Sequence, residues 1–220
     1  MKLMVIDGNS IINRAYYGIR PLTTREGLYT HAIYGFLSTM SRLKDEEKPD
    51  ALCVTFDRKE PTFRHLKYDG YKAQRKAMPE ELSAQMPVLK EVLDAMNVPR
   101  YELAGWEADD LIGTIAAACE AGGWECVAVT GDKDSFQLIG PGTSVRHVKT
   151  RMGQTETVLY DTERFEQEYD GLFLVIAVYI VAAAHSDKIA VATLLYCCHR
   201  LPPKIYDIPL YIYNLSAIFR

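Results

Sequence analysis

Short apolar segments that run into an aspartate are the feature of this sequence that most constrains its fold. Residues 2–6, 51–56 and 126–130 are apolar and of strand length, and amphipathic segments with helical spacing separate them. Alternating strands and helices predict an α/β fold with a mainly parallel central sheet. Each segment is followed within two residues by an aspartate: Asp7, Asp57 and Asp132. Ligands of open α/β sheets gather beyond the carboxyl ends of the strands, so this repetition favours one shared site.

A second acidic group begins a predicted helix. Glu107, Asp109 and Asp110 stand at the start of residues 107–122, and Asp134 follows Asp132 closely. Dense carboxylates repel one another and lose hydration when they are buried, and a divalent cation removes both penalties. One interpretation is therefore a two-metal site that cleaves phosphodiesters. The alternative is that these residues cap helices and strand-end turns, where Asp is favoured for its own reasons.

Residues 58–76 carry a local excess of positive charge. They contain seven Lys and Arg residues against Glu60 and Asp69, a net charge of +5 in a chain whose net charge is -4. Tyr68 and Tyr71 lie among them. Cations pair with phosphates and aromatic rings stack on unpaired bases, so the segment is typical of a nucleic-acid contact. A solvated charged loop is the competing interpretation.

The remaining composition bounds compartment and domain organisation. Five cysteines without the spacing of a zinc site indicate reduced thiols. Asp7 comes too early for a secretory signal, so we expect a cytoplasmic protein with no membrane association. Residues 171–220 contain six charged residues, and the apolar run 172–184 is too short to cross a bilayer. A compositional boundary is expected near Asp170.

Six motifs in order along the chain resemble one known family. They are Val5-Ile6-Asp7-Gly8-Asn9-Ser10, Phe56-Asp57, Phe63-Arg64-His65, Tyr71-Lys72-Ala73-Gln74-Arg75, Glu107-Ala108-Asp109-Asp110 and Thr130-Gly131-Asp132-Lys133-Asp134. Together they resemble the 5′-3′ exonuclease domain of bacterial DNA polymerase I, in the flap endonuclease superfamily. The resemblance covers residues 1–169. It implies a PIN-like three-layer α/β domain with a helical arch.

The resemblance also implies a cofactor, a substrate and the residues that bind them. Two Mg²⁺ ions, or Mn²⁺, would be held by Asp7, Asp57, Glu107, Asp109, Asp110, Asp132 and Asp134. The substrate would be DNA with a 5′ single-stranded flap or end, cleaved during replication and repair. Residues 58–78 would contribute to the arch through which that strand passes. The arch residues expected to contact DNA are Arg64, Tyr71, Lys72, Arg75 and Lys76.

Residues 170–220 depart from the family pattern. The family continues with a Gly-Asp-Ser-Ser-Asp-Asn segment, which supplies two more metal carboxylates, and with a glycine-rich helix–hairpin–helix element for duplex DNA. Here Asp187 and Asp207 are the only acidic residues after Asp170, and Gly171 is the last glycine. A change of reading frame near residue 170 would explain this tail. We therefore expect impaired cleavage.

Two other functions fit part of the pattern. A non-catalytic remnant that binds single-stranded DNA would keep the basic segment without needing the missing ligands. A PIN-type ribonuclease would share the carboxylates, although residues 58–76 argue against it. Val5 and Asn9 stand where a phosphatase of the haloacid-dehalogenase type would need a second aspartate, and Phe136 occupies the third ligand position of a calcium loop. The sequence leaves the oligomeric state open.

Overall fold

A computed structural model describes residues 1–68, 70–74, 77–151 and 154–169 of the chain. Arg75, Lys76 and the predicted tail 170–220 therefore lie outside the described residues. The chain divides into two units, Met1–Asp161 and Thr162–Arg220. In the second unit the described residues form helix α6 (Thr162–Tyr169), in which the rings of Phe165 and Tyr169 stack 4.8 Å apart. No helix in the described part of the chain is long and apolar enough to cross a membrane.

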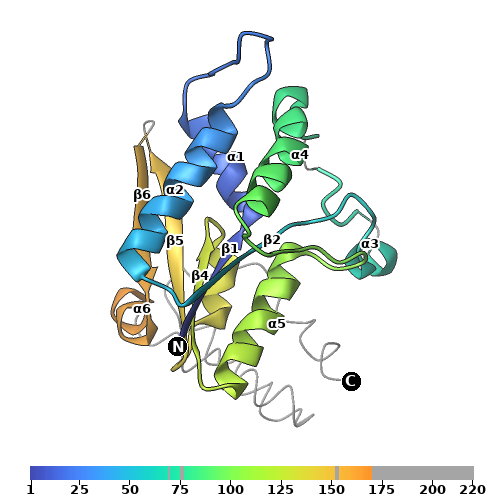
Figure 1. Ribbon diagram of the computed structural model, residues 1–220. Coiled ribbons are helices and arrows are strands. Elements are labelled where there is room, and N and C mark those ends of the chain that lie inside the picture. The colour runs from blue at the N-terminus through green and yellow to red at the C-terminus, as the bar shows by residue number, and fades with distance from the viewer. Residues whose placement is uncertain (69, 75–76, 152–153, 170–220) are drawn as a thin grey trace. The chain divides into compact units, whose positions relative to one another are not determined.

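The first unit is built on a six-stranded sheet with the order β3-β2-β1-β4-β5-β6. Five of its strands are parallel, and β6 pairs with β5 in the antiparallel direction (Figure 1). The strands are β1 (Lys2–Asp7), β2 (Ala51–Thr55), β3 (Arg100–Tyr101), β4 (Glu125–Thr130), β5 (Thr143–Arg151) and β6 (Gln154–Tyr160). The predicted α/β class with a mainly parallel sheet is confirmed.

Helices connect the strands as the sequence pattern predicts. They are α1 (Gly8–Gly18), α2 (His31–Glu47), α3 (Phe63–Lys67), α4 (Glu80–Ala95), α5 (Ala108–Ala121) and the 3-10 helix η1 (Lys133–Leu138). The predicted arch comprises residues 58–78. In its described part, α3 is the one helix, and a turn follows at residues 70–74.

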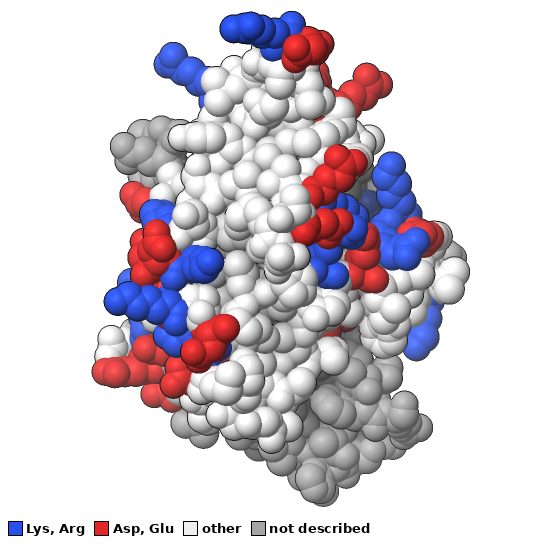
Figure 2. All heavy atoms as spheres, viewed as in Figure 1, with Lys and Arg blue, Asp and Glu red and all other residues white. Residues whose placement is uncertain are grey.

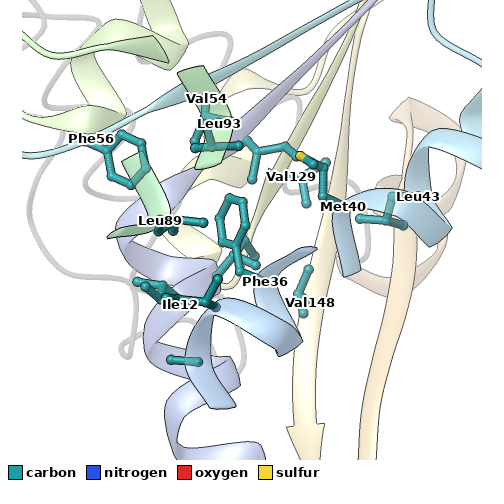
Figure 3. Close-up of a cluster of buried hydrophobic side chains, with 14 of the residues drawn as sticks. Ile12, Phe36, Met40, Leu43, Val54, Phe56, Leu89, Leu93, Val129 and Val148 are labelled. Atoms are coloured by element: carbon teal, nitrogen blue, oxygen red, sulfur yellow. The ribbon is translucent and has the colours of Figure 1, made fainter. Parts of the chain in front are cut away.

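Alternating strand residues give the sheet two buried faces. Met4 and Ile6 of β1 join one apolar cluster, with Val54 of β2 and Val129 of β4. Helices α1, α2 and α4 cover this face, and Figure 3 shows the side chains of Phe36 and Leu89 pointing into the cluster. Because successive side chains of a strand point to opposite faces, the residues between them point the other way.

Helix α5 covers the opposite face. It packs against β1, β2 and β4, and Cys126 of β4 is buried next to Val127, which belongs to the cluster on the first face. Burial raises the pKa of Cys53 and of Cys126 to about 12, so neither thiol ionises at neutral pH. Cys53, Cys119 and Cys126 are free cysteines, as predicted for reduced thiols. The unit thus has three layers: helices, sheet and helix.

A buried glutamine links α4 to the start of α2. Gln85 is fully buried, and its Oε1 accepts the N–H of Ala32 at 2.9 Å and that of Ile33 at 3.4 Å. Its amide nitrogen donates to the carbonyl oxygen of Glu81 at 2.9 Å. The first N–H groups of a helix have no partner within the helix, and Thr30 does not cap α2 through its side chain. Gln85 therefore supplies the cap from a different helix.

Replacing Gln85 with leucine should destabilise the fold. The substitution keeps an apolar volume but leaves the N–H of Ala32 buried without an acceptor, which costs about 1–3 kcal/mol of unfolding free energy. Urea denaturation of Gln85→Leu measures this loss. Gln137→Leu, at an exposed position of η1, is the matched control. Equal transition midpoints for the two variants would contradict the capping role.

Candidate functional site

The carboxyl end of β1 delivers a buried carboxylate. Asp7 caps α1, because its Oδ1 accepts the N–H of Ser10 at 2.9 Å, while its Oδ2 accepts the hydroxyl of Thr130 at 2.9 Å. The side chain is 6% exposed. Loss of hydration, together with repulsion from Asp57 and Asp132, outweighs these hydrogen bonds and raises the pKa of Asp7 to about 6.

Asp57 joins three elements beyond the end of β2. Its Oδ1 accepts the N–H of Ala108, the first residue of α5, at 2.7 Å. Its own N–H donates to Oδ1 of Asn9 in α1 at 3.0 Å. The start of α5 is thereby fixed beside the carboxyl ends of β1 and β2, which brings the acidic residues of α5 to the strand ends.

Asp109 lies where the charges meet. Desolvation, followed by repulsion from Asp7, Asp132, Asp57 and Glu107, raises its pKa to about 8. Asp109 is nevertheless exposed, so water reaches it. The rise of its pKa therefore depends on the surrounding negative charges as well as on lost hydration. Five carboxylates therefore converge beyond the strand ends. They form the acidic cluster: Asp7, Asp57, Glu107, Asp109 and Asp132.

The remaining two predicted carboxylates are placed differently. Asp134 is exposed at the start of η1, and its N–H donates to Oδ1 of Asp132 at 3.0 Å. Asp110 accepts the N–H of Glu107 at 3.0 Å and is otherwise bound to an arginine. Asp134 thus contacts the acidic cluster through Asp132, and Asp110 contacts it through Glu107.

Cations of the predicted arch contact carboxylates at the start of α5. The guanidinium of Arg64 binds both oxygens of Asp110, each at 2.7 Å, and lies 3.6 Å from Glu107. The ammonium of Lys72 lies 2.7 Å from Oε1 of Glu107, and the hydroxyl of Tyr71 donates to its Oε2 at 3.0 Å. These three side chains, predicted to contact DNA, are here held against the acidic site.

Capping and charge convergence turn out to be compatible. Asp7, Asp57, Asp110 and Asp132 each accept a backbone N–H, as the capping interpretation predicts. The same contacts hold their charges near one another. The capping interpretation therefore holds for these four residues and does not exclude a shared site, which stays a prediction.

Polar residues around Gly131 complete the site, and the sequence patterns did not single them out. The hydroxyl of Ser10 accepts the N–H of Gly131 at 2.9 Å, and Arg14 donates to its carbonyl oxygen. A Cβ at Gly131 would displace the end of the Arg14 side chain from this position. Buried His147 lies 3.1 Å from the same carbonyl oxygen, and burial lowers the pKa of this imidazole. The Asp-Gly-Asn-Ser motif was the available signal for Ser10.

The donor chemistry of the cluster fits a hard divalent cation. Carboxylate oxygens are the ligands that Mg²⁺ and Mn²⁺ prefer, and a bound cation would offset the burial and the like-charge repulsion that raise the pKa values of Asp7 and Asp109. Among the described residues, however, no group of three or more His, Cys, Asp or Glu is arranged to hold an ion. Capping hydrogen bonds and the contacts with Arg64 and Lys72 occupy many of the oxygens.

Figure 2 shows how charge is distributed on one face of the molecule. Cationic and anionic side chains are intermixed beside α3 and α4, where Arg58 pairs with Glu60 and Arg100 bridges Asp94 and Glu102. The positive charge of residues 58–76 is thus partly neutralised by the protein's own carboxylates.

Known proteins with similar sequences all point to one family. A family model described as "5′-3′ exonuclease, N-terminal resolvase-like domain" matches residues 2–170. DNA polymerase I of Caldicellulosiruptor bescii is 40% identical over 169 residues, which is 77% of this chain and 20% of that protein. DNA polymerase I of Bacillus subtilis is 41% identical over 168 residues, 76% of this chain and 19% of that protein. The chain spans about a fifth of the length of these curated relatives.

Solved structures share the fold at lower sequence identity. The T5 5′-exonuclease with bound zinc ions has a TM-score of 0.58 at 20% identity, covering 77% of this chain and 61% of that one. A bacteriophage T5 flap endonuclease in a complex with DNA and metal ions has a TM-score of 0.58 at 19% identity, with the same coverage. The predicted PIN-like α/β fold is confirmed.

Removing the charge of Asp7 should stabilise the fold at neutral pH. Because the pKa of Asp7 rises from 3.8 to about 6 in the folded state, its ionised form costs about 1–3 kcal/mol above pH 6. Asp7→Asn should unfold at higher urea concentration than the parent chain at pH 7.5. The advantage should vanish as the pH falls below about 4, where Asp7 is protonated in both states.

Asp45→Asn provides the matched control for that comparison, since Asp45 is exposed on α2. It should change the free energy of unfolding little at either pH. An Asp7→Asn variant that is less stable than the parent at pH 7.5 would show that the hydrogen bonds of Asp7 outweigh the charge repulsion.

Proposed function

The chain belongs to the family of 5′-3′ exonuclease N-terminal, resolvase-like domains, and we propose that it hydrolyses phosphodiester bonds of DNA at a 5′ single-stranded flap or end. The observation that carries this proposal is the acidic cluster beyond the ends of three parallel strands, with arch cations beside it. The DNA complex of the T5 flap endonuclease supports the choice of substrate. Replication and repair of DNA in the cytoplasm would be its setting.

Divalent ions, Mg²⁺ or Mn²⁺, are the proposed cofactors, in line with the metal ions bound to the T5 enzyme. The chemistry that two such ions supply is activation of water and neutralisation of charge on the leaving oxygen. Asp7, Asp57, Glu107 and Asp109 would hold one ion, with Asp110 at the same helix start. Asp132 and Asp134 would hold the other. A bound cation would offset the repulsion between carboxylates that helps to raise the pKa values of Asp7 and Asp109.

The arch residues would position the scissile phosphate. Lys72 and Arg64 lie within ion-pair distance of Glu107, so a phosphate approaching the cluster meets both cations. Lys72 would exchange its carboxylate partner for a phosphate oxygen, and Tyr71 would be free to stack on a base once it leaves Glu107. Arg75 and Lys76 extend the same cationic sequence and would add phosphate contacts. Residues 58–78 would thus serve as the arch.

The domain organisation that follows is a nuclease domain over residues 1–169 and a tail over residues 170–220 outside the family pattern. The second ion would rest on Asp132 and Asp134 alone, because residues 170–220 lack the segment that supplies two further carboxylates in the family. We therefore propose that cleavage by this chain is slow. A non-catalytic DNA-binding remnant is the second candidate, favoured by the loss of those carboxylates and of the family's duplex-binding element from residues 170–220.

Single-turnover cleavage of a fluorescent 5′-flap DNA separates these two candidates. This chain should cleave slowly at millimolar Mg²⁺ and faster when a family-like segment replaces residues 170–220, because the second ion then gains ligands. EDTA and the Asp109→Asn variant should abolish cleavage. Equal rates with and without the replacement would show that the segment is dispensable. Binding without cleavage in both proteins would favour the DNA-binding remnant.

Charge removal in the arch should flatten the salt dependence of DNA binding. Each lost phosphate contact should reduce the slope of log K against log salt by about 0.7–0.9, so Lys72→Ala and Arg75→Ala should each bind single-stranded DNA more weakly and with a shallower slope. Lys44→Ala, an exposed lysine on α2, is the control. An unchanged slope in both arch variants would argue against the arch assignment.

A further inference from the structure

Two aromatic rings meet at the surface between α3 and the segment that leads into α5. The ring centroids of Phe63 and Trp106 are 5.1 Å apart at an interplanar angle of 57°. The N–H of Phe63 donates to the carbonyl oxygen of Gly105 at 3.0 Å, so the two segments lie side by side (Figure 1). Trp106 is 38% exposed and Leu66 is 81% exposed. Single exposed apolar residues are ordinary, but here several occupy one place.

One face of α3 combines apolar and cationic side chains. Phe63, Leu66 and Lys67 stand three and four residues apart, so they share a side of the helix. The ammonium of Lys67 lies 5.8 Å from the centroid of the Phe63 ring, and the guanidinium of Arg64 lies 4.5 Å from it. Among the described residues Lys67 forms no ion pair with a carboxylate, in contrast to the paired Arg58.

This surface adjoins the acidic cluster directly. Trp106 precedes Glu107 in the chain, and Arg64 contacts the Phe63 ring while it binds Asp110 at 2.7 Å. A strand whose backbone reaches the cluster therefore passes the two rings. Its phosphates would meet Lys67, and its bases would meet the exposed ring of Trp106.

We propose that Phe63, Leu66, Lys67 and Trp106 form a stacking platform for an unpaired base of the DNA strand next to the scissile phosphate. The proposal rests on the proposed nuclease function and adds a second base contact, distinct from Tyr71. Aromatic faces bind bases of any sequence, and they need bases whose faces are not covered by duplex stacking. The unpaired cation at Lys67 complements a polyanion, which favours nucleic acid over an apolar protein partner.

The chain's two tryptophans allow a direct test. Trp106 precedes α5 and Trp124 follows it, about 20 Å away along the helix. Trp124→Phe leaves Trp106 as the sole reporter at the platform, and Trp106→Phe leaves Trp124 as a reporter remote from it. Each protein is titrated with a short thymidine oligonucleotide in EDTA, which prevents cleavage. A matched oligonucleotide of abasic sites supplies the same phosphates without bases. Anisotropy of a labelled oligonucleotide reports binding separately.

The platform predicts a specific pattern. Emission from Trp106 should be quenched by the thymidine oligonucleotide and much less by the abasic one, while emission from Trp124 should not change. Trp106→Ala should weaken binding of the thymidine oligonucleotide by about 5- to 150-fold, as expected for one lost stacking contact, and should affect the abasic one little. Trp106→Phe should retain most of the affinity because it keeps a ring.

Other results separate this proposal from the nuclease function itself. DNA binding with unchanged Trp106 emission would overturn the platform and leave the proposed function standing. Equal quenching by both oligonucleotides would also overturn it, since bases would then play no part. A Trp106 signal that follows protein concentration without DNA would assign the surface to contact between copies of the chain. Failure of the parent chain to bind or cleave any DNA would overturn both proposals.

Discussion

The hydrogen bond from the N–H of Ala108 to the Asp57 carboxylate, 2.7 Å long, fixes the arrangement on which the site depends. Helix α5 lies on one side of the sheet and carries the Glu107-Ala-Asp-Asp sequence at its first turn. Asp57 lies beyond β2, in the neighbouring strand position to β1 and Asp7. One contact therefore brings the acidic start of a helix to the carboxyl edge of the sheet. A negative charge at a helix start is favourable in itself, so the contact also stabilises α5.

The carboxylates at this edge divide into two groups according to their partners. Glu107 and Asp110 are neutralised by Lys72 and Arg64, each at 2.7 Å. Burial, together with repulsion from neighbouring carboxylates, raises the pKa values of Asp7 and Asp109. The repulsion between carboxylates is thus concentrated between the carboxyl end of β1 and the start of α5. A site built only to stabilise the fold would not retain such repulsion, which is characteristic of functional sites.

The sheet could be predicted from the sequence for a simple physical reason, and the same reasoning predicts that the aspartates after its strands share a site. Parallel strands end at the same edge of a sheet. Aspartates that follow such strands are therefore expected at that edge, independently of the conformation of the connecting loops. Asp134 shows the limit of that rule, because the turn into η1 leaves its side chain exposed. The cap supplied by Gln85 could not be predicted either. It depends on two helices packing side by side, which no local pattern along α4 records.

The partners of the arch residues were also beyond sequence reasoning, and their geometries differ in a way that matters for function. Arg64 makes a two-pronged contact with Asp110 and packs on Phe63, so its position is fixed from two sides. Lys72 makes a single ion pair with Glu107, and its ammonium lies 5.3 Å from the centroid of the Tyr71 ring. Releasing Lys72 toward a phosphate therefore gives up a single ion pair, whereas releasing Arg64 would break a two-pronged contact and leave the Asp110 carboxylate without its cation. Lys72 is the side chain better suited to move onto the substrate, and Arg64 the one better suited to hold the start of α5 in place.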